Sequence, residues 1–167
     1  MNISELQFFP LLEMLDSRFV SSIDWSAVDG TEVGYGEIDG ERVQLRLEPI
    51  TFHEHQGFNL SFAVWDGEKF SENMQAKSLH GRARLIGAVT NGLIDHLQSK
   101  SWEFLTAVAK DGIDSRGPLY LRIAMRIARE HKWYFDSLNV RGAAVTVVSK
   151  TLPPLAIARE IITGSHP

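Results

Sequence analysis

The chain has 167 residues, of which 44% are hydrophobic and 23% are charged, and it contains no cysteine. This composition is typical of one globular domain and excludes disulfides and thiolate metal sites. The formal net charge of −4 argues against nucleic-acid binding, and no apolar run reaches the roughly 18 residues of a membrane span. We therefore expect a single domain over residues 1–167, in the cytoplasm and without a nucleic-acid or membrane partner.

The N-terminal residues are expected to form a helical segment. Residues 6–20 have an apolar face, and Pro10 would interrupt a helix interior, so we place it in a first turn. Residues 21–30 are expected to form a loop, which completes an N-terminal segment over residues 1–30.

Strands are predicted over residues 31–65. Apolar and polar side chains alternate on both sides of Asp39-Gly40, and this pattern is typical of a β-hairpin because both turn residues need positive φ. Residues 60–64 alternate in the same way and predict a third strand. Residues 65–79 are polar and irregular and predict a long loop.

Helices and strands alternate in the C-terminal half. Residues 84–150 are expected to form a helix-strand-helix-hairpin unit, and one more helix follows it. The predicted elements are a helix over 84–97, a strand over 104–109, a helix that begins at Arg116, strands over 133–140 and 143–150, and a helix over 155–162. This order predicts an α/β or α+β fold, with a mainly antiparallel mixed sheet and helices packed on it.

The residues from Arg82 to Ala88 could bind an anion. We expect them at the start of a helix, where unpaired N–H groups and the helix dipole favour a group such as a pyrophosphate. Gly87 would permit a close approach of the backbone, and Arg82 and Arg84 add positive charge. The alternative is that both arginines lie at the edge of an amphipathic helix and that Gly87 serves close packing.

Tyr120 lies early in the helix that begins at Arg116. A phenol in this position could donate a proton to a leaving thiolate and so act as a general acid. The alternative is a partly buried helix residue with its hydroxyl at the rim of the core.

Both segments resemble the GNAT superfamily of acyl-CoA-dependent N-acetyltransferases. The pyrophosphate loop of that family reads Arg/Gln-x-x-Gly-x-Gly/Ala and opens a helix. Arg82, Ile86 and Gly87 match this frame, while Leu85 stands where the first glycine belongs.

The resemblance extends to the C-terminal half of the chain. Leu119-Tyr120 matches the family's Leu-Tyr ahead of the final hairpin, and Trp133-Tyr134-Phe135 matches an aromatic strand start. The combination of Ser115-Arg116 with Leu119-Tyr120 also looks like uncharacterised GNAT-like proteins of bacteriophages. This likeness implies the cytoplasm of a bacterium or of a phage-infected host.

The resemblance implies a GNAT-like sandwich and two alternative functions. In the first, the chain transfers an acyl group from acetyl-CoA or another acyl-CoA to a small-molecule or protein amine, and Tyr120 protonates the thiolate. The co-substrate would be held by Arg82, Arg84, Ile86, Gly87 and Ala88. In the second, the chain is a catalytically inactive GNAT-like module that binds a protein partner. The second hypothesis accounts for Leu85 and for the lack of a general base in the sequence pattern, where Glu54 and Asp66 are candidates only because they flank the third strand.

Three further patterns have two interpretations each. His53 and His55 share one face of an extended segment and could bind a metal, but no third ligand is identifiable, so we expect a polar loop and no metal cofactor. Trp65 and Phe70 are either packed under a loop or, if exposed, a contact site. The basic residues that recur at helical spacing predict a solvated helix face, with an anion or partner surface as the alternative; they are Arg122, Arg126, Arg129 and Lys132.

Overall fold

The structure is a computed structural model that describes residues 23–38, 40–71, 79–110, 116–140 and 142–163. The side chains of residues 79–83 and of the end residues 110, 116 and 140 are not described. The helix predicted over residues 6–20 lies outside the described residues, and no helix within them is long and apolar enough to cross a membrane.

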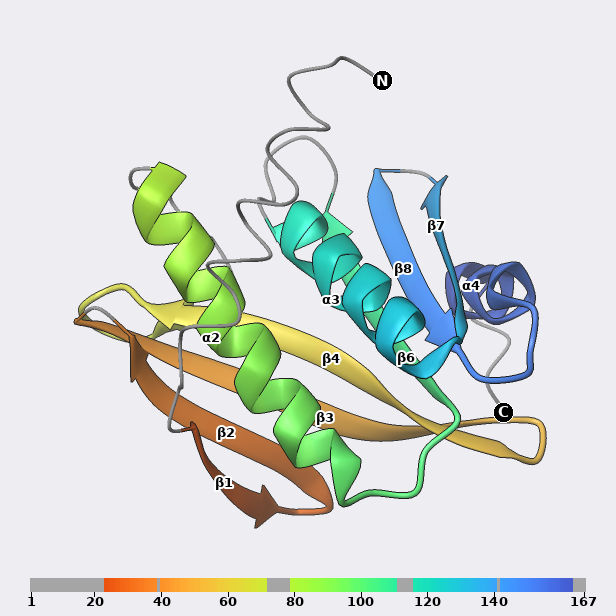
Figure 1. Ribbon diagram of the computed structural model, residues 1–167, viewed down its shortest axis with the longest axis horizontal. Helices are drawn as coiled ribbons and strands as arrows, with labels where there is room; N and C mark the ends of the chain where they lie inside the picture. Colours follow the sequence, from red (N-terminus) through yellow and green to blue (C-terminus); the bar gives the residue numbers. More distant parts are fainter. Residues whose placement is uncertain (1–22, 39, 72–78, 111–115, 141, 164–167) are drawn as a thin grey trace.

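Eight strands form one open sheet, and three helices pack on it in the described part of the chain (Figure 1). The strands are β1 (Ile23–Val28), β2 (Thr31–Ile38), β3 (Glu41–Phe52), β4 (His55–Trp65), β5 (Phe70–Ser71), β6 (Phe104–Lys110), β7 (Tyr134–Val140) and β8 (Ala143–Ser149). The helices are α2 (Leu79–Gln98), α3 (Arg116–His131) and α4 (Pro154–Thr163). This confirms the predicted mixed fold with a mostly antiparallel sheet.

The strand order is β1-β2-β3-β4-β6-β8-β7, with β5 paired to β4 outside this path. Neighbouring strands run antiparallel except β4 and β6, which are parallel. Two antiparallel blocks therefore meet at a single parallel junction in the middle of the sheet.

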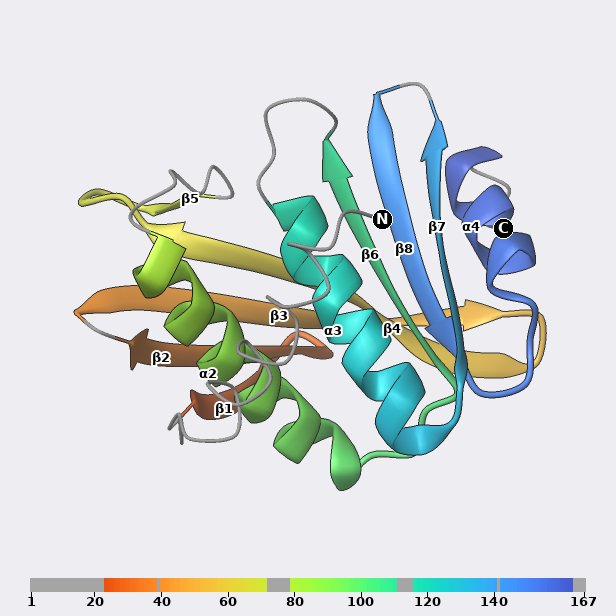
Figure 2. The same cartoon turned by 45° about the horizontal axis from the view of Figure 1, so that its top comes forward.

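The helices lie on both faces of the sheet. Leu105, Ala107 and Ala109 of β6 pack in the cluster that contains the buried side chains of α2 and α3, whereas Phe104 packs in a second cluster with Ile157 of α4. Successive side chains of a strand point to opposite faces, so α2 and α3 cover one face and α4 the other. Figure 2 shows α2 over the β2–β4 half and α3 over the β6–β8 half.

The first strand corrects the sequence interpretation. Residues 23–28 were predicted to lie in a loop, but they form β1 and pair with β2 along their whole length. The turn between them contains Asp29 and Gly30, both with positive φ, as a tight type I′ hairpin requires. The signal was the Asp-Gly pair, the same signal that predicted the turn at Asp39-Gly40.

Other boundaries also differ from the prediction. The loop expected over residues 65–79 contains β5, whose Phe70 pairs with Trp65 of β4. The helix predicted from residue 84 begins at Leu79, five residues earlier. The strand predicted over residues 60–64 is longer and forms β4 from His55 to Trp65, and the other elements predicted within the described residues are present. Gly57 supports the parallel junction because a Cβ there would lie 2.3 Å from the carbonyl oxygen of Phe104.

Candidate functional site

The parallel junction of β4 and β6 ends abruptly. Its pairs run from Gly57↔Phe104 to Leu60↔Ala107, and beyond them the two strands are no longer paired. On the same edge of β4, β5 pairs only from Val64 onward. Three residues of β4, 61–63, therefore have no strand neighbour on this side among the described residues.

The side chain of Tyr120 fills this gap. Its ring is 2% exposed, and its hydroxyl oxygen accepts a hydrogen bond from the backbone N–H of Phe62, with 3.1 Å between the two heavy atoms. Phe62 is the middle residue of the unpaired segment. The hydroxyl thus takes the place of the carbonyl that β6 would supply if it continued beside β4. It gives the buried N–H of Phe62 a hydrogen-bond partner, and without one this N–H would destabilise the folded state.

The frame from Arg82 to Ala88 begins at the end of the first turn of α2 and lies mostly inside the helix. An α-helix leaves only its first four N–H groups without an intrahelical partner, and in α2 these belong to residues 79–82. The N–H groups of Ile86, Gly87 and Ala88 lie one turn or more further along, where helix geometry directs them to backbone carbonyls.

The side chains of the frame contribute mostly to packing. Leu85 is 6% exposed and belongs to the core cluster under α2, and Gly87 and Ala88 are buried in the same helix. Ile86 and Arg84 are partly buried. The side chain of Arg82 lies outside the described ones, so its part in an anion site stays a prediction.

The two carboxylates predicted as general bases lie at opposite ends of β4. Glu54 is exposed in the β3–β4 turn, and Asp66 is exposed just after the last residue of β4. The Asp66 carboxylate accepts the backbone N–H groups of Lys69 and Glu68, both at 2.9 Å, and these bonds lower the pKa of Asp66. Such a carboxylate is a weaker base, and the structure does not bring either residue next to Tyr120.

The two histidines predicted as a metal pair have different surroundings. His53 is an exposed turn residue with positive φ, and His55 lies with its Nδ1 3.1 Å from Oε1 of Glu103. Within the described ranges, no group of three or more His, Cys, Asp or Glu side chains could hold a metal ion.

The basic residues of α3 and Lys132, which follows the helix, do not form one uniform surface. Arg122 is partly buried, and Arg126 forms an ion pair with Glu130 one turn later, at 2.8 Å between Nε and Oε1. Arg129 and Lys132 are exposed. The positive charge that solvent meets is therefore concentrated at the C-terminal end of the helix.

The aromatic pair Trp65 and Phe70 is half-buried on the sheet face opposite α2. The two rings are 5.2 Å apart, Tyr35 contacts Phe70 at 5.6 Å, and the guanidinium of Arg42 lies 4.9 Å from the Trp65 ring. A hollow of about 460 Å³ adjoins them, and it is lined by Gln44, Arg46, Glu48, Asn59, Ser61, Ala63 and Phe70. The sheet face opposite α2 is therefore mainly polar at this hollow, with aromatic side chains beside it.

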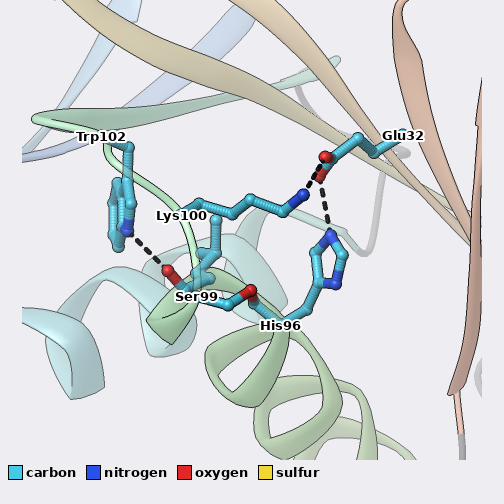
Figure 3. Close-up of polar contacts among 6 residues, drawn as sticks. Glu32, His96, Ser99, Lys100 and Trp102 are labelled. Carbon is cyan, nitrogen blue, oxygen red and sulfur yellow. Dashed lines mark hydrogen bonds and ion pairs between the residues drawn. The ribbon is translucent and has the colours of Figure 1, made fainter.

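A polar cluster between β2 and α2 escaped the sequence interpretation. Glu32 of β2 accepts from Nε2 of His96 at 2.7 Å and forms an ion pair with Lys100, as Figure 3 shows. The imidazole of His96 stacks on Trp25 of β1, with the rings 3.9 Å apart and 7° from parallel. These residues are distant in sequence, and only the pairing of β1 with β2 under α2 brings them together.

The charge state of Glu32 reflects these partners. Burial raises the pKa of Glu32, but the hydrogen bonds from Lys100 and His96 lower it by more, so that the pKa lies below the ordinary value. The carboxylate is therefore ionised at neutral pH and holds β2 to the C-terminal part of α2.

Comparison of the chain with protein-family models, with curated proteins and with solved structures gives no match. Function must therefore be inferred from the side chains and the sheet topology described above.

Proposed function

We propose that the chain is a GNAT-like module that does not catalyse acyl transfer and that binds a protein partner. The observation that carries this proposal is the hydrogen bond between the Tyr120 hydroxyl and the Phe62 N–H. A general acid has to reach the atom that receives its proton. Here the phenol oxygen is buried and bonded to the strand edge beside which a thioester would have to lie.

The frame from Arg82 to Ala88, which was predicted to bind an anion, supports the same proposal. Leu85 stands in place of a glycine and is part of the core, so a bound phosphate could approach the backbone there only after the packing of α2 had changed. Neither Glu54 nor Asp66 is placed to deprotonate an amine at this junction. An intact enzyme would need a phosphate site, a base and an accessible acid together.

Exposed aromatic side chains support a binding role. Tyr134 is 63% exposed, Phe135 is 42% exposed and Tyr35 is 44% exposed. Aromatic residues are enriched among the side chains that dominate protein–protein binding energy. Tyr134 and Phe135 open β7, which is the last strand of the sheet order and so presents an edge to a partner.

A titration with acetyl-CoA, combined with a transfer assay, tests the proposal. We expect no saturable heat in calorimetry up to millimolar acetyl-CoA, and no acetyl transfer to a panel of polyamines, aminoglycosides and lysine peptides. Arg82→Ala should leave both results unchanged. Micromolar binding that Arg82→Ala weakens, or transfer to any amine of the panel, would contradict the proposal.

Acyl transfer remains the second candidate, because one observation favours it. The parallel strands β4 and β6 separate after Leu60 and Ala107, and an acyl-CoA arm could enter such a gap if Tyr120 turned away. An amine could then lie in the hollow on the opposite face, where Glu48 provides a carboxylate. In that case Tyr120→Phe should lower turnover by roughly 10²–10⁴-fold, the usual range for a general acid.

A further inference from the structure

The hollow of about 460 Å³ on the sheet face opposite α2 lies over the middle of β3 and β4. Its floor consists of three cross-strand pairs, Gln44↔Ala63, Arg46↔Ser61 and Glu48↔Asn59. These residues alternate along β3 and β4 with core residues packed under α2, so their side chains point to the other face. The volume lies within the range of about 300–1,000 Å³ that is usual for small-molecule sites.

Apolar side chains bound the hollow at both ends. Phe70 lines one end, and its ring lies 5.6 Å from that of Tyr35 and 5.2 Å from that of Trp65. Past the other end, Ile50 is the next residue of β3 on this face, and it packs against the cluster that contains Ile157 of α4. Among the described elements, the hollow is thus the part of this face that neither the aromatic cluster nor α4 covers.

Two side-chain amides in the lining are held by hydrogen bonds to the protein. The hydroxyl of Thr106, which is fully buried, donates to Oδ1 of Asn59 at 3.0 Å. Nε2 of Gln44 donates to the hydroxyl oxygen of Tyr35 at 3.0 Å. In the described part of the chain, Nδ2 of Asn59 and Oε1 of Gln44 have no partner. One amide therefore offers a donor to a ligand, and the other offers an acceptor.

Arg46 and Glu48 bring opposite charges to the hollow. They lie two positions apart on β3, which separates their Cα atoms by about 7 Å. Both are exposed, and no ion pair between described residues includes either of them. An anionic ligand would be repelled by the carboxylate, and a cationic ligand by the guanidinium. A ligand without net charge is compatible with both side chains.

Hydroxyl groups match this lining, because each hydroxyl can donate one hydrogen bond and accept two. The lining supplies donors, acceptors and one group that is both, from Arg46, Asn59, Gln44, Glu48 and Ser61. A site for an apolar molecule is lined mainly by hydrophobic side chains, whereas only Ala63 and Phe70 are apolar here. A pyranose ring carries hydroxyls around its edge and C–H groups on its faces, and the C–H groups can pack against an aromatic ring.

We infer that this hollow binds a neutral saccharide. One pyranose ring lies over β3 and β4, with hydroxyls bonded to Arg46, Glu48 and Asn59 and with its C–H groups toward Phe70. Because the open hollow contacts only one side of such a ligand, the affinity is in the millimolar range. This site goes beyond the proposed binding of a protein partner and does not depend on it.

An NMR titration with neutral sugars tests the inference. The probes are the methyl glycosides of glucose, galactose, mannose and N-acetylglucosamine, each added up to tens of millimolar. We expect at least one probe to shift the amide signals of Arg46 and Ser61 saturably and to leave that of Asn139 in β7 unchanged. Absence of a saturable shift with all four probes would overturn the inference.

Asn59→Asp keeps the oxygen that accepts from Thr106 and removes the amide donor. It should weaken glycoside binding by roughly three- to tenfold, the effect of one lost hydrogen bond. Asn139→Asp makes the same change at an exposed position of β7 and should leave the affinity unchanged. Thermal melts establish that both variants are folded. Equal glycoside affinities for the two variants would contradict the inference.

A charged probe separates a saccharide from other ligands. Glu48→Gln retains an acceptor for a hydroxyl and loses the charge, so the glycosides should still bind this variant, and n-butylamine should bind neither it nor the wild type. Binding of n-butylamine that is tighter than that of any glycoside and is lost in Glu48→Gln would assign the hollow to an amine and overturn the inference. Acetyl transfer by the wild-type chain would contradict the proposed function, while the glycoside titration would still decide this inference.

Discussion

The hydroxyl of Tyr120 connects α3 to the unpaired part of β4. Its oxygen accepts the N–H of Phe62 within the buried core. A buried backbone donor without a partner costs about 1–3 kcal/mol. The structural role of the Tyr120 hydroxyl as a hydrogen-bond acceptor is therefore sufficient to explain why a tyrosine stands at this position. No catalytic role as a proton donor is needed to explain it.

Tyr120→Phe should lower the free energy of unfolding by about 1–3 kcal/mol, because the ring stays and only the acceptor is lost. The control is Tyr35→Phe, which removes an exposed hydroxyl bonded to Gln44 and should change stability by less than about 0.5 kcal/mol. Chemical denaturation of both variants measures the difference. Equal stabilities for wild type and Tyr120→Phe would show that the hydroxyl is dispensable for folding.

Glu32 should make folding depend on pH in acid. Its pKa is lower in the folded chain than the ordinary value of 4.5, so its contribution is fully present above about pH 4.5 and is lost as the pH falls through the folded value. Glu32→Gln should therefore destabilise the protein at pH 7, by about 1 kcal/mol or less given its partial exposure, and much less at pH 3.

Urea titrations at both pH values measure this effect, with Glu54→Gln in the exposed β3–β4 turn as the control. The titratable groups that face Glu32 are His96 of α2 and Lys100, two residues after the end of that helix. A Glu32→Gln penalty that stays the same from pH 7 to pH 3 would show that the carboxylate contributes nothing through its charge.

Among the predicted helices, α2 begins five residues earlier than expected, and this changes the position of the Arg82–Ala88 frame within the helix. The apolar residues at helical spacing from Leu85 onward correctly predict a helix. They do not indicate that this helix begins as early as Leu79. With five more residues in the helix, the residues that resemble a phosphate loop lie in its interior. Leu85 is then a core residue, and its size is explained by packing.

Leu85→Gly, which places a glycine where the GNAT pattern has one, should destabilise the protein by about 3 kcal/mol or more, from the cavity and from the lower helix propensity of glycine. Leu121→Gly makes the same change at a 37% exposed position of α3 and should cost only about 1 kcal/mol. Thermal melts give the ranking. Acetyl-CoA binding gained by Leu85→Gly would show that leucine alone had blocked a phosphate site.

The parallel junction depends on one glycine. In Gly57→Ala, the new Cβ would lie 2.3 Å from the carbonyl oxygen and 2.6 Å from the ring of Phe104, so strand or ring must move, at a cost of about 1–3 kcal/mol. Gly117→Ala in α3 is the control, because its Cβ would meet only Ala109 at 3.8 Å. A denaturation midpoint for Gly57→Ala at or above that of Gly117→Ala would contradict the close approach.

Local patterns in the sequence predicted most of these elements but not their partners. The Asp-Gly turn and the alternation around it gave the β2–β3 hairpin, and the apolar period gave α3. The sequence did not reveal that Tyr120 would face Phe62 or that Glu32 would meet His96, because both contacts join residues that are distant in the chain. Such pairs depend on the strand order, which no local pattern encodes.

At the scale of the whole molecule, the sheet presents two different surfaces. One face carries α2 and α3, as Figures 1 and 2 show. The other face carries α4 over one half and the polar hollow of β3 and β4 over the other. The gap between β4 and β6 lies between these surfaces, and Tyr120 fills it.

The most direct test is the NMR signal of the Phe62 amide during a titration with acetyl-CoA. If the Tyr120 hydroxyl and the core seal the gap between β4 and β6, the ¹H and ¹⁵N shifts of this amide should not change up to millimolar acetyl-CoA, and the amide should remain protected from hydrogen exchange. A saturable shift of the Phe62 amide, together with loss of that protection, would show that the co-substrate enters the gap and would contradict the account.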